Sequence, residues 1–284
     1  MKVLVTGVKG QLGYDVFKKL NNEGYNVLGI DIEDLDITNK EAVITYLSNY
    51  KPNLVIHCAA YTQVDKAELN EDMCHKVNAL GTKYLAEACK MIDASMLYIS
   101  TDYVFDGSKD GYYEVDDKTC PISVYGKTKL EGEEYVKSLL DKYYIIRISW
   151  AYGVNGNNFI KTMLRLSETR NELNVVCDQV GSPTYTADLA ILISDMIKTN
   201  KYGIYHATNE GVCSWYEFAS KIFELAGKDI KVNPVTTKEY LVMVTQQAKR
   251  PMNSKMSKLS LDKAGFNRLP SWKNALERYL KELI

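Results

Sequence analysis

Three glycines spaced three residues apart, Gly7, Gly10 and Gly13, follow a short apolar run at the start of the chain. The run, residues 2–6, is rich in β-branched residues and predicts a strand, and the apolar residues after the glycines recur at helical spacing. A strand that turns tightly into a helix exposes unpaired N–H groups and the positive end of the helix dipole. Residues without side chains let a diphosphate approach that end closely. The segment therefore predicts a dinucleotide site at the start of the protein.

The GxxGxxG spacing departs from the GxGxxG of the usual dinucleotide fingerprint, and a strand-to-helix turn without a ligand is the alternative. Two later features favour the ligand. A second apolar segment, residues 26–30, ends in Asp31, whose carboxylate is placed to accept hydrogen bonds from a ribose hydroxyl. A third, residues 54–57, runs into the small residues Ala59 and Ala60, which let a flat ligand lie close to the end of the strand.

Composition excludes several classes of function. The 284 residues suffice for one large domain or for a large and a small one, and 46% hydrophobic with 25% charged residues is ordinary for a globular protein. A net charge of −1 argues against nucleic-acid binding, and no apolar run reaches the ~20 residues of a membrane span. The six cysteines form no CxxC pair, which predicts reduced thiols. The three histidines are scattered and lack the spacing of metal ligands. A strand at the very start of the chain predicts that there is no leader peptide. We therefore expect a cytoplasmic protein.

Strands and helices alternate through the first half of the chain. Strands are expected at residues 2–6, 26–30, 54–58, 95–100 and 144–149. Helices are expected at residues 11–23, 39–49, 72–91 and 123–141, the second of them capped from the segment 36–39. Such alternation predicts an α/β fold of the doubly wound Rossmann type, with a parallel sheet, helices on both faces, and ligands outside the carboxyl ends of the strands.

The second half has shorter elements and denser turns, which suits a smaller lobe that closes over a substrate. We expect helices near residues 186–198, 214–226 and 271–283, a strand near 203–206, and a loop-rich stretch from Thr236 to Ser257. The predicted domains are a nucleotide-binding domain over residues 1–150, to which 184–208 returns, and a smaller C-terminal substrate-binding lobe over 151–284.

A strand end and a YxxxK motif carry the candidate chemistry. The fourth expected strand ends in Thr101 and Asp102, which places a hydroxyl and a carboxylate at the ligand edge of the sheet. Tyr125 and Lys129 stand at i and i+4 near the start of the next helix and therefore lie on one face. A second YxxxK at residues 14–18 is interpreted as a solvated helix face, so the motif depends on its context.

Together these residues predict the reduction of a carbonyl group. A hydride delivered to a carbonyl carbon leaves negative charge on the oxygen, and an acid must then donate a proton. A free tyrosine has a pKa of about 10, so we expect the ammonium of Lys129 to lower the pKa of Tyr125. The hydroxyl of Thr101 can hydrogen-bond both the carbonyl oxygen and the phenol, and Lys129 can also hold the nicotinamide ribose.

With these residues in view, the chain resembles the extended short-chain dehydrogenase/reductase superfamily and, within it, the dTDP-4-dehydrorhamnose reductase family. The stretches that carry the resemblance are residues 7–13, 59–62, 64–68, 100–105, 124–130, 149–150, 156–159, 178–184 and 250–254. The resemblance covers essentially the whole chain. It implies reduction of the 4-keto group of dTDP-4-dehydro-L-rhamnose to dTDP-L-rhamnose by NADH or NADPH, a step of nucleotide-sugar and polysaccharide biosynthesis.

The resemblance also implies roles for individual residues. The catalytic residues would be Thr101, Tyr125 and Lys129. The cofactor would be bound by Gly7, Gly10, Gln11, Leu12, Gly13, Asp31, Asp36, Ile37, Ala59, Ala60, Tyr61, Thr62, Ile99, Tyr125 and Lys129. The substrate would be bound by Thr101, Asp102, Tyr103, Trp150, Asn158, Gln179 and Arg250.

For two of these substrate residues the sequence also allows a purely structural interpretation. Trp150 sits just past a strand end, where an indole can stack on a sugar face, and a buried core tryptophan is the alternative. Arg250 would pair with the diphosphate of the sugar nucleotide as a bidentate donor, and a surface arginine is the alternative.

Several points stay open at this level. Asp31 favours NADH by repelling a 2′-phosphate, whereas Lys9 offsets that charge, so either cofactor is expected. No carboxylate cluster accompanies Glu282, so the magnesium ion of some relatives is not carried over. The competing interpretations are a sugar-nucleotide 4-epimerase or 4,6-dehydratase and a non-catalytic regulatory protein on the same fold. The expected partner is a nucleotide sugar, with a homodimer allowed.

Overall fold

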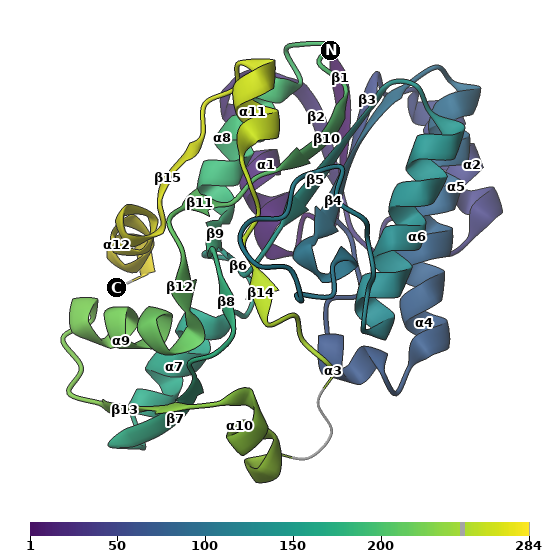
Figure 1. Cartoon of the computed structure of the whole chain (residues 1–284). Coiled ribbons are helices and arrows are strands. Elements are labelled where there is room, and N and C mark those ends of the chain that lie inside the picture. Colours follow the sequence, from purple (N-terminus) through teal and green to yellow (C-terminus); the bar gives the residue numbers. More distant parts are fainter. Residues whose placement is uncertain (245–247, 284) are drawn as a thin grey trace.

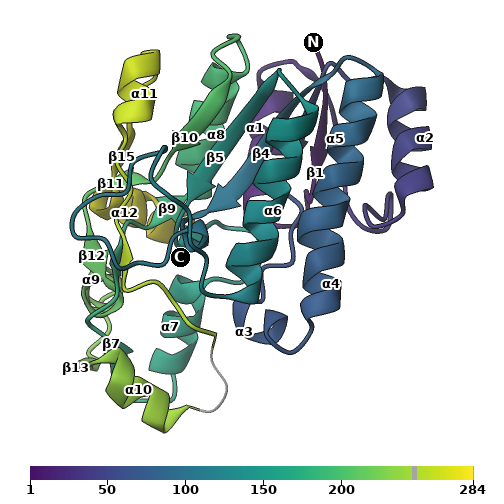
Figure 2. The same cartoon turned by 45° about the vertical axis from the view of Figure 1, so that its right-hand side comes forward.

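A six-stranded parallel sheet forms the centre of the computed structural model, which describes residues 1–244 and 248–283. The strand order is β10-β5-β4-β3-β1-β2, and every neighbouring pair is parallel. The strands are β1 (Lys2–Thr6), β2 (Asn26–Ile30), β3 (Leu54–His57), β4 (Ser95–Thr101), β5 (Tyr143–Ile148) and β10 (Gly203–His206). Helices lie on both faces of the sheet (Figures 1 and 2), and the doubly wound α/β prediction is therefore confirmed.

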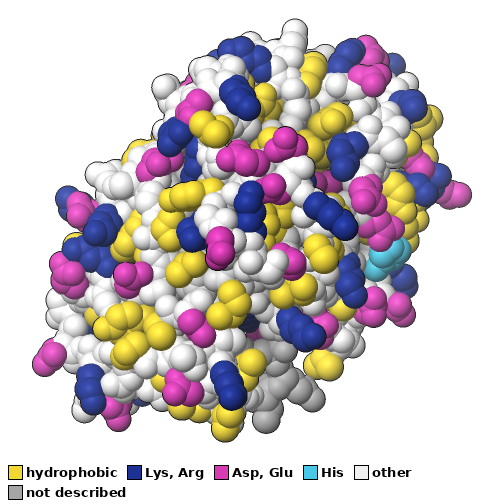
Figure 3. All heavy atoms as spheres, in the orientation of Figure 1, with side chains coloured by type: hydrophobic (Ala, Val, Ile, Leu, Met, Phe, Trp, Pro, Cys, Tyr) yellow, Lys and Arg dark blue, Asp and Glu magenta, His cyan; other side chains and the backbone are white. Residues whose placement is uncertain are grey.

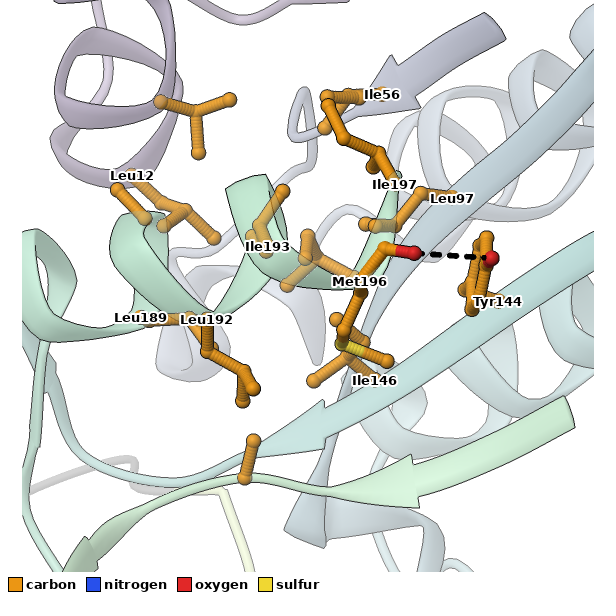
Figure 4. Packing of buried hydrophobic residues seen from close by; sticks show 14 of the residues in the cluster. Leu12, Ile56, Leu97, Tyr144, Ile146, Leu189, Leu192, Ile193, Met196 and Ile197 are labelled. Atoms are coloured by element: carbon orange, nitrogen blue, oxygen red, sulfur yellow. Dashed lines mark hydrogen bonds between the residues drawn. The ribbon is translucent and has the colours of Figure 1, made fainter. Parts of the chain in front are cut away.

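Apolar residues at helical spacing dock the helices onto the two faces. The main helices are α1 (Gln11–Asn22), α8 (Thr186–Met196), α2 (Lys40–Tyr50), α5 (Gly81–Met91) and α6 (Val124–Leu139). Helices α1 and α8 share one core with the sheet, in which Leu12 of α1 and Leu189 and Ile193 of α8 lie near Ile56 and Leu97 of the strands (Figure 4). Helices α2, α5 and α6 cover the opposite face. Apart from the start of α5, the ends of these helices lie within two residues of the predicted positions.

The later elements outside the sheet build a smaller lobe with its own core. Its strands are the short β6 (Ala151–Tyr152), β7 (Glu172–Val176), β8 (Val180–Gly181), β9 (Thr184–Tyr185), β11 (Asn209–Glu210), β12 (Cys213–Ser214), β13 (Lys231–Val235), β14 (Asn253–Ser254) and β15 (Leu269–Ser271). Its helices are α7 (Phe159–Ser167), α9 (Trp215–Leu225), α10 (Thr237–Met243) and α12 (Trp272–Leu283), while α11 (Leu259–Ala264) packs against the large core. Aromatic residues such as Tyr152, Phe218 and Tyr279 fill the core of this lobe.

One expectation about elements is confirmed with a refinement and another is wrong. The helix expected over residues 72–91 is a continuous helical stretch made of α4 (Glu71–His75), the π-helical turn η1 (Lys76–Leu80) and α5, with right-handed helical backbone at both junctions. The stretch expected to be loop-rich contains α10, because Thr236 and Glu239 form a reciprocal capping box that stabilises its first turn. Helix α2 is capped as expected, since Asn39 accepts a hydrogen bond from the N–H of Ala42.

Positive and negative side chains alternate over the face seen in Figure 3, in keeping with a net charge near zero. Among the helices of the described ranges, none is both long and apolar enough to cross a bilayer.

Candidate active site

The glycine turn between β1 and α1 forms the first part of the site. Gly7 has a φ of +73°, and a Cβ there would lie 2.7 Å from the backbone nitrogen of Ala59. A Cβ on Gly13 would lie 2.2 Å from the carbonyl oxygen of Gly7. Gly10 is exposed and stands at the N-cap of α1, so the start of the helix is left open. This narrow backbone cradle fits a diphosphate bound at a helix N-terminus.

Asp31 lies at the end of β2, beside that turn. Its carboxylate accepts hydrogen bonds from the N–H groups of Lys9 and Ile32, both at 2.9 Å. The ammonium of Lys9 lies 2.8 Å from the carboxylate of Glu33, so the expected counter-charge to Asp31 is paired elsewhere. Further along, Asp36 is exposed, and the buried Ile37 lies beside Gly81 of α5.

The segment 59–62 follows β3 at the same edge and is anchored by a residue that sequence reasoning missed. Asn78, on the π-helical turn η1, accepts a hydrogen bond from the N–H of Tyr61 (2.8 Å) and donates one to its carbonyl oxygen (3.2 Å). The same amide donates to the hydroxyl of Thr128 in α6 (3.2 Å). In the sequence, the signal for this role is a polar Asn78 between the apolar Val77 and Ala79 inside an expected helix. Asn78 therefore ties the candidate cofactor segment to the helix that carries Tyr125.

Thr101 and Asp102 lie buried at the carboxyl end of β4, two positions after Ile99 of the same strand. The hydroxyl of Thr101 donates to the carboxylate of Asp102 (3.0 Å) and accepts from the N–H of Tyr103 (3.2 Å). Ser254 donates a second hydrogen bond to Asp102. Burial nevertheless raises the pKa of Asp102 to about 6, because the charged carboxylate is removed from water.

Tyr125 lies in the first turn of α6, next to this strand end. Ser123 caps the helix by accepting a hydrogen bond from the N–H of Gly126 (3.1 Å). A Cβ on Gly126 would lie 2.2 Å from the carbonyl oxygen of Tyr103, so glycine is what allows this close approach. The rings of Tyr103 and Tyr125 meet edge to face with centroids 5.4 Å apart. The first turn of α6 is thus packed against the turn that follows β4, at the ligand edge of the sheet.

Lys129 lies one helical turn after Tyr125 and is buried. Its ammonium lies 4.1 Å from the ring centroid of Tyr98. Burial lowers the pKa of Lys129 to about 7, and the carboxylate of Glu133 opposes that shift. Burial raises the pKa of Tyr125 well above its ordinary value, with hydrogen bonding to Thr101 acting in the opposite direction. The pKa of Tyr125 is therefore raised and not lowered as expected, because burial is the largest influence on it.

Trp150 follows β5 and forms an aromatic stack at the boundary of the smaller lobe. Its ring lies nearly parallel to that of Trp215, with ring centroids 3.7 Å apart. The ring centroid of Phe159 lies 4.6 Å from that of Trp215. A Cβ on Gly181 would lie 3.0 Å from the Trp150 ring. One face of the indole is therefore covered by Trp215, a residue that sequence reasoning did not identify because it lies 65 positions further along the chain.

Three of the expected binding residues are hydrogen-bonded within the protein. Asn158 caps α7 by accepting from the N–H of Lys161 (3.0 Å) and donates to the amide oxygen of Gln11 (3.1 Å). Gln11 also accepts from the N–H of Gly153 (2.8 Å). Gln179 is buried and donates to the hydroxyl of Thr237 at the start of α10 (3.1 Å). These contacts connect the two lobes and the elements around the site.

Arg250, in the segment just before β14, contacts residues at the same edge of the sheet. Its guanidinium donates to both carboxylate oxygens of Asp65, each at 2.9 Å, and to the hydroxyl of Tyr103 at 3.1 Å. The expected pairing with a diphosphate stays a prediction, and Asp65 is a partner that the sequence did not reveal. Within residues 1–244 and 248–283, no group of three or more His, Cys, Asp and Glu residues is arranged to hold a metal ion.

A doubly wound parallel sheet with a glycine turn, and with Thr101, Tyr125 and Lys129 at its ligand edge, defines an oxidoreductase of the extended short-chain dehydrogenase/reductase class. Over residues 1–284 the sequence matches the profile of the family described as RmlD substrate binding domain. The chain belongs to this family, whose relatives named below are dTDP-4-dehydrorhamnose reductases.

Individual relatives are similar over their full length. The chain is 46% identical to the dTDP-4-dehydrorhamnose reductase of Aggregatibacter actinomycetemcomitans, with 97% of each chain covered. The crystal structure of a dTDP-4-dehydrorhamnose reductase from Clostridium acetobutylicum superposes with a TM-score of 0.96 at 47% identity and covers 100% of this chain and 99% of that one. The enzyme from Bacillus anthracis in complex with NADP superposes with a TM-score of 0.95 at 44% identity, with the same coverage.

Proposed function

We propose that this chain reduces the 4-keto group of dTDP-4-dehydro-L-rhamnose to dTDP-L-rhamnose with NADH or NADPH. The observation that carries the proposal is the packing of Tyr125 and Gly126, in the first turn of α6, against Tyr103 at the carboxyl end of the strand that carries Thr101. Its support comes from relatives that are named for this reaction and align over the whole chain, one of them in complex with NADP.

The residues present fit a nicotinamide cofactor. The cradle of Gly7, Gly10 and Gly13 would hold the diphosphate, Asp31 would face the adenosine ribose, and the segment 59–62 would line the path toward Lys129. When bound, the dihydronicotinamide supplies a hydride to the carbonyl carbon of the sugar and is thereby oxidised.

The chain's own residues would manage the proton. Tyr125 would donate the proton of its hydroxyl to the sugar oxygen as negative charge develops there. The raised pKa of Tyr125 suits this direction of reaction, because the phenol stays protonated at neutral pH until the oxygen demands the proton. Thr101 would hydrogen-bond the same oxygen, and the ammonium of Lys129 would stabilise the phenolate left behind.

The substrate would lie between this edge and the smaller lobe. Trp150, whose ring is stacked on that of Trp215, would contact the sugar. Asp102, Tyr103 and Arg250 complete the polar surroundings of the site. The free thiols of the described residues support the proposal of a cytoplasmic protein, and a homodimer remains a prediction for a light-scattering measurement.

The proposed function is tested with purified protein and candidate dTDP- and UDP-linked 4-keto-6-deoxy sugars. Nicotinamide absorbance is followed with NADH and with NADPH. We expect oxidation of the cofactor with the dTDP-linked 4-keto sugar, and a loss of about 10²-fold or more in kcat for Tyr125→Phe, because the proton donor is removed.

The matched control is Tyr14→Phe, which alters the tyrosine of the second YxxxK on an exposed helix face. Its kcat should equal that of the unaltered protein. Near-normal turnover by Tyr125→Phe, or no turnover of any dTDP-linked 4-keto sugar, would contradict the proposed function.

A further inference from the structure

The segment 248–254, here called the strap, runs from a contact with Asp65 at the ligand edge of the sheet to β14, which pairs with β8 of the smaller lobe. In Figures 1 and 2 the yellow segment that carries β14 passes between α3 (Val64–Ala67) and the smaller lobe. Its end is held by Asn253, whose amide donates to the carbonyl oxygens of Lys109 (2.6 Å) and Gly111 (2.8 Å). Ser254 donates to Asp102. The strap is therefore bonded directly to a residue of the candidate active site.

The beginning of the strap is held by Asp65, which lies in the first turn of α3. The carboxylate of Asp65 accepts hydrogen bonds from the N–H of Ala248 (3.1 Å) and from the guanidinium of Arg250 (2.9 Å to each oxygen). A second nitrogen of Arg250 donates to the hydroxyl of Tyr103 (3.1 Å). The guanidinium thus joins an acidic residue of the large domain to an aromatic residue of the site.

The contact continues to the expected proton donor. The ring of Tyr103 is flanked edge to face by that of Tyr125 at 5.4 Å, and Gly126 brings the two backbones together. One nitrogen of the guanidinium donates to both oxygens of Asp65 while another donates to Tyr103, so the planar group is held at two of its nitrogens and the hydroxyl of Tyr103 has a fixed partner. The side chains of Asp65 and Arg250 are 42% and 27% exposed, so their pairing adds little to global stability, and its main effect is on geometry.

We propose that Asp65 is a positioning residue for the reduction: it holds Arg250 so that Arg250 fixes Tyr103 against Tyr125 and draws the strap over the sugar site. This inference rests on the proposed function. It differs from the expectation that Arg250 binds the diphosphate, since in that role Arg250 would act without Asp65. As a positioning pair, Asp65 and Arg250 must act as one unit.

The test is a double-mutant cycle in the full-length protein with Asp65→Asn, Arg250→Met and the double variant. Steady-state kinetics give kcat and KM for the dTDP-linked 4-keto sugar, and calorimetry gives the affinity for dTDP. We expect each single variant to lose about tenfold in kcat, with dTDP affinity changed less than about twofold. The double variant should lose no more than either single one, because both changes break the same unit.

A conservative variant and a matched pair serve as controls. Asp65→Glu keeps the carboxylate and should recover most of the lost kcat. Arg268 and Asp262 form a similar pair away from the site, with Nε and Oδ1 2.8 Å apart. Arg268→Met and Asp262→Asn should leave kcat unchanged.

Two outcomes would overturn the positioning role. One is a tenfold loss of dTDP affinity in Arg250→Met with normal kcat and affinity in Asp65→Asn, which would show that Arg250 contacts the diphosphate by itself. The other is multiplication of the two losses in the double variant, which would show independent action.

A measurement without turnover separates this inference from the proposed function. Lys249 is exposed in the strap, and its cleavage by trypsin reports release of the strap. We expect cleavage at least about threefold faster in both single variants and in the double one. If the unaltered protein failed to reduce the sugar, the proposed function would fall. Equal cleavage rates in all variants would instead reject the strap contact itself.

Discussion

At the scale of single residues, the same motif has opposite meanings at two places in the chain. Tyr14 and Lys18 lie on an exposed helix face, whereas Tyr125 lies beside Thr101 and Lys129 is buried. Burial pushes the pKa of Lys129 down to about 7 and that of Tyr125 up. The environment, and not the motif, therefore decides which protonation states are available for catalysis.

The lowered pKa of Lys129 predicts how kcat/KM depends on pH. A lowered pKa of about 7 means that the free protein carries the ammonium of Lys129 below pH 7 and loses it above. In the proposed mechanism that charge stabilises the phenolate of Tyr125, so kcat/KM for the nicotinamide cofactor should fall as pH rises through about 7. Lys129→Met should be slower and show no such decline. A decline that persists in Lys129→Met would assign it to another group.

At the scale of elements, α6 owes its position to glycines. A Cβ on Gly132 would lie 2.4 Å from the hydroxyl of Tyr98 and 2.9 Å from the carbonyl oxygen of Asn78. Helix α6 therefore packs closely against the π-helical turn η1, which also supplies Asn78 to the segment 59–62. The distance between these two elements sets where Tyr125 stands.

The substitution Gly132→Ala tests this packing. Helix propensity alone predicts stabilisation by about 1 kcal/mol. The steric conflict with η1 predicts the opposite, a loss of about 1–3 kcal/mol in the free energy of unfolding and a lower kcat. Urea unfolding gives the sign, and Glu134→Ala on the exposed face of α6 should change stability by less than about 0.5 kcal/mol. A more stable Gly132→Ala protein would refute the close packing.

At the scale of the whole molecule, a buried ion pair joins the sheet to the helix layer behind the site. Arg147 of β5 donates to both carboxylate oxygens of Glu133 in α6, at 2.9 and 2.7 Å, and to the carbonyl oxygen of Val115 (3.1 Å). Ser100 of β4 also donates to Glu133. Two strands, a helix and a connecting segment therefore meet at one pair of charges.

Breaking one side of this pair should be costly. Arg147→Met leaves the carboxylate of Glu133 buried without its partner and should lower the free energy of unfolding by about 3–5 kcal/mol. The double variant Glu133→Met/Arg147→Met should lose less, because no isolated charge remains. Chemical unfolding of the three proteins measures both values. Losses that simply add in the double variant would show that the two charges do not act as a pair.

The strands of the sheet, the helices on its faces and the glycine turn follow from the sequence alone. Apolar spacing, caps such as Asn39 and the spacing of Gly7, Gly10 and Gly13 involve residues close together in the chain, so they are legible without a structure. The π-helical turn and α10 escaped this reasoning. A single π-helical turn inside a long helix depends on its packing, and the capping box of α10 is a short signal within a polar stretch.

The tertiary structure alone decided the electrostatics and the partners at the site. The pKa values of Tyr125 and Lys129 depend on burial, which spacing does not report. The link from Asp65 to Arg250 joins residues 185 positions apart. Sequence by itself thus determined the scaffold and the residue types at its ligand edge, because these arise from local pattern. The tertiary structure decided which side chains contact one another there and which of them are protonated. Desolvation and long-range contacts exist only once the chain has folded.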